Sequence, residues 1–523
     1  MPPVAERNSP VDLESCAREP IHLIGRIQSH GVLFALSEPD FVVRQVSANA
    51  STLLGTPVDA ILGKSIEAVL GPPQFETFRS RLRSDDLAPA SSLRVSIGKP
   101  AVEMNCVAHR HDGVLIVECE FVKGAHWVAP AELSANIQIL LERMERATTI
   151  LDYCRVAASE IQRLSGFDRV MIYQFDPEFN GEVVAENGGV TEPRSPGNLK
   201  YLGLRFPSTD MPAQARELFL QNPLRAIADI DSAQIPITPE IGPRTGRPLD
   251  MRHTFLRSAS AIHLEYLRNM GVRASMAISI VVKGRLWGMV ACHHAKPWHV
   301  DCSTRAICEM IARNLALQAS LRIADAAQQS QVASRELLED FADELEEADG
   351  SVNSRSFGGT RFIELFDADG LVSHLGGVVA LQGVTESHAA LLPVIEKLKK
   401  LAVRGIASSD KLTALDAGAE SYRSKASGAL YIGINERAND YLLFLRRELV
   451  ETVEWAGNPD KSVNTDAAGR LSPRVSFAAW QETVHGRSRP WSEAELDSAR
   501  ALRVQVRHLQ DIAKLRQLEE RES

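Results

Sequence analysis

The chain has 523 residues, more than one hydrophobic core usually organises, so we expect about two to four domains. Its composition, with 44% hydrophobic and 24% charged residues, is that of folded globular proteins. The formal net charge of −9 provides no basic surplus to neutralise phosphates, which argues against a nucleic-acid partner. The sequence has no run of about 18 apolar residues and no secretory leader, so we expect a cytoplasmic protein without a membrane partner.

Seven cysteines, an odd number without the spacing of a metal site, suit a reducing compartment. We expect most of them to be small buried hydrophobic residues. Cys16 differs, because it lies outside any periodic apolar pattern near the N-terminus. Both an accessible, reactive thiol and an inert surface cysteine are open interpretations of Cys16.

The first module is predicted at residues 1–128. Apolar strand patterns at 32–48 and 92–122, with helical periods between them, indicate a small α+β domain. The segment 130–165 then has an amphipathic helical pattern with few breakers, so we expect one long helix there.

A second α+β module is predicted at residues 129–320. Two apolar runs flank Lys283 and Gly284, which predicts a β-hairpin at this point. Over 304–347 the pattern is helical with almost no glycine or proline, as in a helix that connects domains or pairs with a partner helix.

A third module is predicted at residues 321–505, and the tail over 493–522 has the pattern of another charged helix. We expect segment 506–523 of this tail to be a linker helix. Its apolar residues favour a coiled-coil seam over a short capping helix: Leu502, Val506, Leu509, Ala513 and Leu518. The predicted fold class is α+β, with three antiparallel-sheet modules joined by long helices that suit signal relay.

One candidate binding segment, 205–218, places Asp210 between two prolines and directly before a helix-forming stretch. Pro207 and Pro212 restrict the residues before them to extended conformations, so this loop should be stiff. The helix dipole favours a carboxylate at a helix start, and a main-chain carbonyl can be left pointing outward there. An ordinary helix cap is the alternative interpretation of Asp210.

Histidines and arginines form a second group of candidates. Arg257 with Arg225 could bind carboxylates through two bonds each, although a solvated helix face is the alternative. His293 and His294 must face opposite sides of a strand, and no acid or cysteine is spaced to complete a ligand set, so we expect no metal site. Residues at steps of three would share one helix face: Arg257, Ser260, His263 and Tyr266.

The third module contains a segment whose pattern fits two structures. Residues 447–455 alternate like a strand, and 472–480 fit either a strand or a helix. As a strand, Arg474 and Ser476 face the same way; as a helix they point roughly oppositely, while Phe477 aligns with the apolar residues after it. The segment could therefore be bistable, with a plain hairpin as the alternative.

Taken together, these motifs resemble the bacterial phytochrome family in order, spacing and local sequence, as PAS, GAF and PHY domains. The resemblance implies a red/far-red photoreceptor that binds biliverdin. Cys16 would form the thioether to the chromophore, and the main-chain carbonyl of Asp210, in PSTDMP, would accept bonds from the inner pyrrole nitrogens. His263 would lie beside the chromophore, and His293 would bond the ring D carbonyl.

The resemblance also implies roles for the remaining candidates. Phytochromes with other bilins have a cysteine where this chain has Ile262, which favours attachment at Cys16 and hence biliverdin. Phe219 and Ala277 replace hydroxyl side chains that often bond a propionate, each worth about 1 kcal/mol. The propionate contacts would be Arg225, Arg257, Ser260 and Ser275. The mostly aromatic ring D pocket would comprise Met171, Tyr173, Tyr201, Phe206 and Tyr266.

In relatives, the segment at about 447–488 is a tongue that refolds between sheet and helix, which here would exchange Arg474 for Ser476 at Asp210. The stretch around Ile27 would be threaded through a GAF loop as a knot. We expect no enzyme, a parallel homodimer, and an output such as a histidine kinase outside this chain. The alternatives are a light-independent sensor of another ligand and a metal-dependent enzyme built on His263, His293 and His294.

Overall fold

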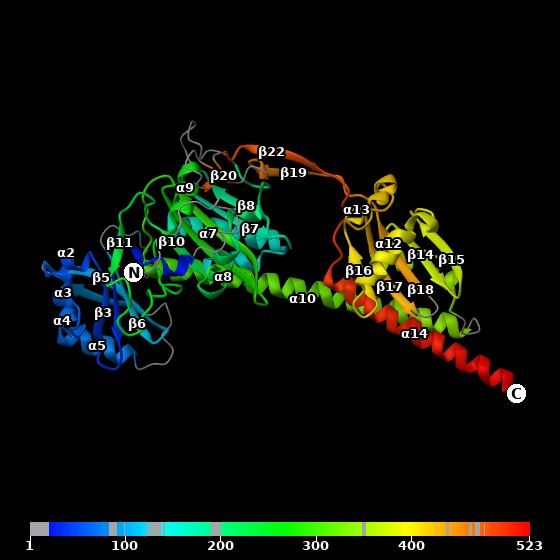
Figure 1. Ribbon diagram of the computed structural model, residues 1–523, viewed down its shortest axis with the longest axis horizontal. Coiled ribbons are helices and arrows are strands. Elements are labelled where there is room, and N and C mark those ends of the chain that lie inside the picture. Colours follow the sequence, from blue (N-terminus) through cyan, green and yellow to red (C-terminus); the bar gives the residue numbers. More distant parts are fainter. Residues whose placement is uncertain are drawn as a thin grey trace. The chain divides into compact units, whose positions relative to one another are not determined.

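The computed structural model describes residues 20–82, 92–98, 100–122, 126, 138–139, 142–189, 200–347, 352–435, 439–459, 463–465, 471–474 and 476–522. The chain forms two compact units. One comprises Met1–Ser320 with Glu454–Trp480, and the other comprises Leu321–Val453 with Gln481–Ser523. Three main sheets carry the fold, and the described strand pairs within them are antiparallel except for one pair (Figure 1). The predicted α+β class with three antiparallel-sheet modules is therefore confirmed.

The first sheet is built around β2 (Gly31–Ser37), whose residues are all buried. Even-numbered residues such as Phe34 pack into the core of this module, whereas Leu33 and Ala35 face a second apolar cluster. A strand buried on both faces explains why its sequence does not alternate. The other strands of this module are β3 (Val42–Ser47), β4 (Leu93–Ile97), β5 (Val102–His111) and β6 (Val114–Phe121). Its helices are α2 (Ala50–Leu54), α3 (Val58–Ile61), α4 (Glu67–Leu70) and α5 (Pro72–Leu82).

The segment around Ile27 is bonded on both sides by the second module. After η1 (Ile21–Leu23), β1 (Arg26–Gln28) pairs with β11 (Gln234–Thr238). On its other side, the Gln28 N–H donates to the Leu256 carbonyl at 2.8 Å, and the Ser258 N–H donates to the Arg26 carbonyl at 2.9 Å. Strand β1 thus runs between two parts of one loop, which is what the predicted threading requires.

The second sheet separates two apolar layers. Val170 and Ile172 of β7 (Arg169–Phe175) pack on one face with α7 (Ile150–Ser165). Met171 and Tyr173 point to the opposite face. This alternation follows from the two-residue period of a strand. This module also supplies β8 (Gly181–Gly188), β9 (Arg205–Phe206), β10 (Leu224–Ile227), β12 (Ala274–Val282) and β13 (Arg285–His294) to the sheet, which β19 (Glu451–Ala456) and β22 (Ala479–Val484) complete.

Two sequence predictions in this module have different outcomes. The hairpin at Lys283 and Gly284 is confirmed, with left-handed φ values of 50° and 75° that a tight two-residue turn requires. The single helix over 130–165 is wrong, because α7 begins at Ile150 after an extended Thr149. Thr149 and Asp152 form a capping box, which fixes a new helix start inside an otherwise helical pattern.

The predicted helix over 304–347 is confirmed as α10 (Cys302–Glu347), which has 46 residues. The third sheet comprises β15 (Val378–Gly383), β14 (Gly370–Leu375), β18 (Asp440–Arg446), β17 (Gly428–Asn435) and β16 (Ile406–Ser409), in that order. Short elements surround it: η4 (Ser354–Phe357), α11 (Arg361–Leu365), α13 (Leu412–Leu415) and η5 (Ala417–Tyr422). On one face, residues of α12 (His388–Leu401) form a core cluster with this sheet.

The helical tail is confirmed as α14 (Glu493–Glu522), but its interpretation as a seam is wrong for the first half. Leu502, Val506 and Leu509 are buried in the core of the third module. A helix that packs on a sheet needs the same spacing of apolar residues as a coiled coil, so the pattern could not separate the two. Within the described ranges, we find no helix with the length and apolarity that crossing a bilayer requires.

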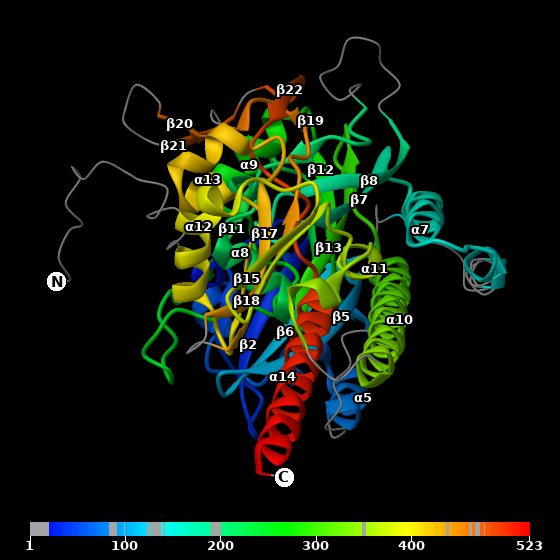
Figure 2. The same ribbon diagram turned by 90° about the vertical axis from the view of Figure 1, so that its right-hand side faces the viewer.

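The described residues of the tongue include four strands. β19 (Glu451–Ala456) and β22 (Ala479–Val484) are neighbours, and Trp455 of β19 pairs with Arg205 of β9. Between them, β20 (Val463–Thr465) pairs with β21 (Leu471–Pro473). β21 lies against α9 (Ala261–Asn269) (Figure 2). β21 and β22 therefore include only the two ends of the segment 472–480, which the sequence predicts to be bistable.

Candidate functional site

A cavity of about 240 Å³ lies in the second module, between the sheet and the elements η3 (Ser208–Asp210), α8 (Ala213–Gln221) and α9. One water molecule needs about 10–15 Å³ on this measure, so the cavity can hold a sizeable organic ligand. Its wall is mostly apolar and aromatic, with a few polar side chains that converge on the same space. Such a wall is typical of a cofactor site.

Eleven of the predicted site residues line this cavity, and so do Phe219 and Ala277. Met171 and Tyr201 lie just behind the wall, where Met171 Sδ accepts a bond from the Tyr173 hydroxyl at 3.9 Å. Cys16 lies outside the described residues. The residues that line the cavity are Tyr173, Phe206, Asp210, Arg225, Arg257, Ser260, Ile262, His263, Tyr266, Ser275 and His293.

The alternation of β13 decides which histidine enters the cavity. Met289, Ala291 and His293 line the cavity, as residues two apart on a strand must do together. His294 lies on the opposite face, stacked on Trp298 with the ring centroids 4.7 Å apart. The predicted division between the two histidines is confirmed. The metal-enzyme interpretation is wrong, because His294 cannot converge with His263 and His293.

The four residues at steps of three all line the cavity, but not as one helix face. α9 begins at Ala261, with Ser260 as its N-cap and Arg257 in the loop before it. Only His263 and Tyr266 belong to the helix, one turn apart, with their rings 6.2 Å apart and nearly parallel. The predicted helix was therefore too long at its start, because Ser260 is a capping residue.

Two arginines give the cavity a cationic side. Arg225 Nη1 donates to the Phe255 carbonyl at 3.1 Å, and Arg257 Nη1 donates to the Ile21 carbonyl at 2.8 Å. Arg257 Nε is buried and has no partner, and no carboxylate of the described chain forms an ion pair with either guanidinium. Burial lowers the pKa of Arg257 to about 10 and lowers that of Arg225 as well. Two cations that line the cavity without a paired carboxylate favour a ligand with carboxylates.

Both cavity histidines are neutral at pH 7. His263 is exposed on the cavity wall, where desolvation by the surrounding protein, assisted by the charge of Arg225, lowers its pKa to about 4. Burial and Arg169 lower the pKa of His293 to about 3. A neutral imidazole offers one donor and one acceptor. Since Nδ1 of His293 is buried and bonds to no described residue, it is available to a polar group of a ligand.

Asp210 joins the cavity to the tongue. Its Oδ2 accepts a bond from the Tyr266 hydroxyl at 2.8 Å and pairs with Arg474 Nη2. Burial raises the pKa of Asp210 to about 6, although Arg474 and the Tyr266 bond lower it. The helix-cap interpretation is wrong, because the N-cap of α8 is Pro212 and no side chain caps this helix.

Arg474 is the tongue residue that contacts Asp210 in this structure. It is 2% exposed, and its guanidinium lies 4.7 Å from the ring centroid of Phe477. Phe477 in turn meets Tyr266 edge to face at 5.2 Å. Ser476 is exposed. β21 ends at Pro473 and β22 starts at Ala479, so neither Arg474 nor Ser476 lies in a strand, and the prediction of their directions in a strand stays a prediction.

Several cavity residues were missed by the sequence analysis. Met289 and Ala291 could have been found, because they precede His293 at two-residue steps on the same strand. Ile21 and Phe179 come from irregular segments that carry no periodic signal. Other missed wall residues are Phe175, Met211, Leu218, Leu224, Ile227, Leu267 and Met270.

Family models match the chain in three successive stretches. They are a PAS fold over residues 16–122, a GAF domain over 149–323 and a phytochrome region over 333–513. This order of domains, with a ligand cavity in the second, defines a light-sensing module.

Relatives support the same assignment. A bacteriophytochrome of Xanthomonas campestris is 35% identical over 511 residues, which cover 95% of this chain and 79% of that protein. Cyanobacterial phytochrome B of Nostoc sp. is 32% identical over 501 residues, covering 95% of this chain and 66% of that protein. The crystal structure of a bacteriophytochrome from R. palustris superposes with a TM-score of 0.83 at 34% identity, covering 95% of this chain and 99% of that one.

The chain belongs to the phytochrome family and forms its PAS–GAF–PHY photosensory core. Family membership implies a bilin chromophore. The chain spans about two thirds of the length of the first curated relatives that it matches, 66% and 65%.

Proposed function

We propose that the cavity binds biliverdin, linked through a thioether to Cys16, and that this chain photoconverts reversibly between two states. One observation carries the proposal: an apolar cavity brings together two guanidinium groups without a paired carboxylate and a neutral histidine with a free ring nitrogen. When bound, the tetrapyrrole supplies visible-light absorption and a double bond between rings C and D that isomerises. Its two propionates suit the arginines of the cavity wall, its flat faces suit the aromatic rings, and its ring carbonyls suit a histidine donor.

The polar residues of the wall divide into two groups. Arg225 and Arg257, with the hydroxyls of Ser260 and Ser275, bind the propionates. His293 donates to the ring D carbonyl, and His263 packs beside the inner rings. The apolar and aromatic residues that surround ring D are Met171, Tyr173, Tyr201, Phe206 and Tyr266.

Attachment at Cys16 agrees with the reach of the chain. Ile21 lines the cavity, and Cys16 precedes it by five residues, which span at most about 18 Å when extended. Ile262 lines the cavity as well, but its side chain has no thiol. Cys16 is therefore the attachment site that we propose.

The Asp210–Arg474 pair would carry the light signal out of the cavity. Tyr266 both lines the cavity and donates to Asp210, so a rearrangement around ring D changes the carboxylate that holds the tongue. The tongue would then refold from sheet to helix and place Ser476 at Asp210 instead of Arg474. The chain would form a parallel homodimer in which α10 and α14 pass this change to an output such as a histidine kinase. The chain itself would be a cytoplasmic protein and no enzyme.

The test is an absorption spectrum of the chain mixed with biliverdin, recorded in darkness and again after red and after far-red illumination. We expect two red-region bands that interconvert reversibly. A bound pigment that light does not change would reduce the site to tetrapyrrole binding. Absence of binding would favour a light-independent sensor of another ligand.

A further inference from the structure

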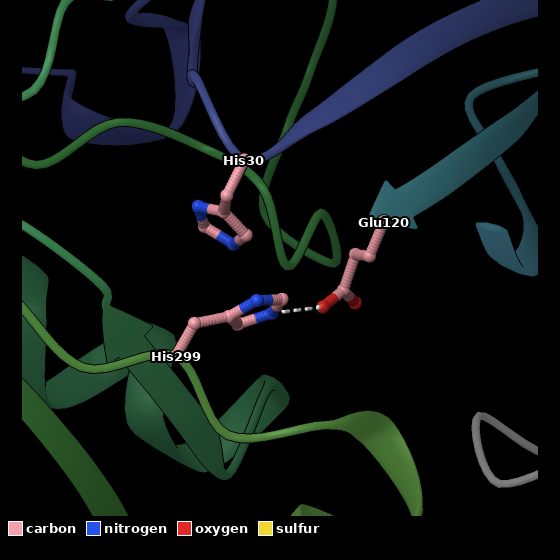
Figure 3. Close-up of side chains that lie close together, drawn as sticks. All are labelled: His30, Glu120 and His299. Atoms are coloured by element: carbon pink, nitrogen blue, oxygen red, sulfur yellow. Dashed lines mark hydrogen bonds and ion pairs between the residues drawn. The ribbon is translucent and has the colours of Figure 1, made fainter. Parts of the chain in front are cut away.

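Three potential metal ligands meet away from the cavity, each on a different segment (Figure 3). His30 lies in the turn between β1 and β2, Glu120 lies near the end of β6, and His299 lies between β13 and α10. One ligand atom from each residue lies within 4.8 Å of the other two. His299 Nε2 already bonds Glu120 Oε2 at 3.1 Å.

The second observation concerns His30. Its Nε2 is buried and has no hydrogen-bond partner in the part of the chain that the structure describes. Figure 3 shows this nitrogen pointing toward the ring of His299, whose centroid is 4.5 Å from that of His30. A buried polar atom without a partner is costly, so its position beside two other ligand groups calls for an explanation.

We propose that His30, Glu120 and His299 bind a divalent transition-metal ion, for which zinc is the best match. Two imidazoles and one carboxylate form a common three-residue ligand set for zinc and leave a fourth tetrahedral position for water or another small ligand. The ion would satisfy His30 Nε2 and would replace the direct His299–Glu120 bond by two bonds to metal.

Arg305 orients the carboxylate. Its Nη1 donates to Glu120 Oε2 at 2.8 Å and its Nη2 donates to Oε1 at 2.6 Å, while its guanidinium lies 3.6 Å from the ring centroid of Phe255. An outer group that fixes a ligating side chain is a usual part of a metal site. The same positive charge lowers the affinity for a cation, so zinc should bind less tightly than at a site without such a neighbour.

The ion would link distant segments within one compact unit. His30 and Glu120 belong to the first module, whereas His299 precedes the start of α10 at Cys302 by three residues. Zinc would therefore hold the first sheet to the beginning of the long helix. The predicted consequence is a higher unfolding temperature of the bilin-free chain in the presence of zinc.

The experiment is a zinc titration of the full chain without biliverdin and without an affinity tag, by equilibrium dialysis with metal analysis. We expect one zinc per chain. Since loss of an outer-shell partner already costs about 10–100-fold, His299→Gln and His30→Gln should each weaken zinc binding by more than about 100-fold. The matched control is His253→Gln, in a second histidine cluster where its ring lies 5.0 Å from that of His111; this change should leave the affinity unaltered.

Cobalt substitution identifies the ligands without any variant. A tetrahedral cobalt spectrum without a thiolate charge-transfer band, together with X-ray absorption that shows imidazole ligands, would support the site even if a variant folds poorly. Failure of the chain to bind zinc, zinc binding by either ligand variant as tight as by the unaltered chain, or a thiolate band from a cysteine would each overturn the proposal.

Discussion

Deleting either member of the Asp210–Arg474 pair should loosen the tongue, and Asp210→Ala should loosen it more than Arg474→Ala. Both side chains are nearly inaccessible, with 11% of Asp210 and 3% of Arg474 exposed. Breaking a buried pair costs about 3–5 kcal/mol when an uncompensated charge stays buried. The two variants differ in whether the residue left behind can lose its charge.

In Arg474→Ala, the carboxyl group of Asp210 can bind a proton. Burial raises its pKa to about 6 while Arg474 lowers it, so removal of Arg474 moves the pKa closer to 7. Each pH unit between the medium and the pKa costs about 1.4 kcal/mol, so the cost of protonation at pH 7 is about 1.4 kcal/mol or less. In Asp210→Ala, the guanidinium of Arg474 cannot deprotonate, so its charge stays buried without a partner and destabilises the docked tongue by about 3–5 kcal/mol. This cost cannot exceed the free energy that docks the tongue, because the tongue then undocks.

The assay is hydrogen–deuterium exchange of β19 and β22 in the bilin-free chain at pH 7 in the dark. Because 1.4 kcal/mol corresponds to a factor of ten, these strands should exchange at least about tenfold faster in Asp210→Ala than in Arg474→Ala. Ser476→Ala is the control, since the side chain is exposed in this form. Equal exchange in the two variants, or the reverse order, would refute the argument from protonation.

Four further outcomes follow from the same structure. Cys16→Ser should leave no pigment on the chain in a denaturing gel, and unchanged covalent colour would contradict the attachment site. Ala277→Ser restores a hydroxyl on the cavity wall and should strengthen bilin binding by about 1 kcal/mol, or about fivefold in Kd; an unchanged Kd would argue against a propionate there. The carboxyl infrared band of Asp210 should titrate near pH 6 and vanish in Asp210→Asn. Because the pKa of Asp210 is raised from 3.8 to about 6, its contribution to the free energy of unfolding is complete below pH 3.8 and is lost as the pH rises through 6. Gly457→Ala would place a Cβ 2.2 Å from the Ser476 carbonyl oxygen at a φ of 88°, so exchange in β19 should accelerate; unchanged exchange would show that the hairpin absorbs the clash.

Local patterns predicted the elements well wherever the pattern had one structural meaning. The hairpin at Lys283 and Gly284 and the helix α10 agree with the sequence. The failures are patterns with two meanings. Thr149 and Asp152 sit in a helical pattern and yet start a new helix, and the apolar stripe of α14 packs on its own sheet instead of on a partner helix.

The cavity was predicted less from patterns than from the family resemblance. Strand alternation alone places His293 on one face and His294 on the other, and the structure agrees. The ion pair between Asp210 and Arg474 joins residues 264 positions apart, a separation at which no periodicity operates. The family resemblance predicted this contact, whereas only the structure shows that Ser476 is exposed.

The sequence analysis did not predict the disulfide between two neighbouring strands of the first module, although the sequence contains a signal for it. The structure pairs Cys106 and Cys119 in a disulfide across β5 and β6. This pairing was recoverable, because Asp112 and Gly113 form a two-residue turn with left-handed φ values of 51° and 72°. Such a turn fixes the register of the strands beside it, and equal steps away from it bring the two cysteines opposite each other.

No comparable signal exists for His30, Glu120 and His299. They come from a turn, a strand end and a loop, and their proximity depends on how the first module packs against the start of α10. Spacing along the chain identifies metal ligands only when one or two local elements supply them, as in zinc fingers. When three distant segments each supply one residue, only the folded chain brings them together, so spacing along the chain carries no information about this cluster.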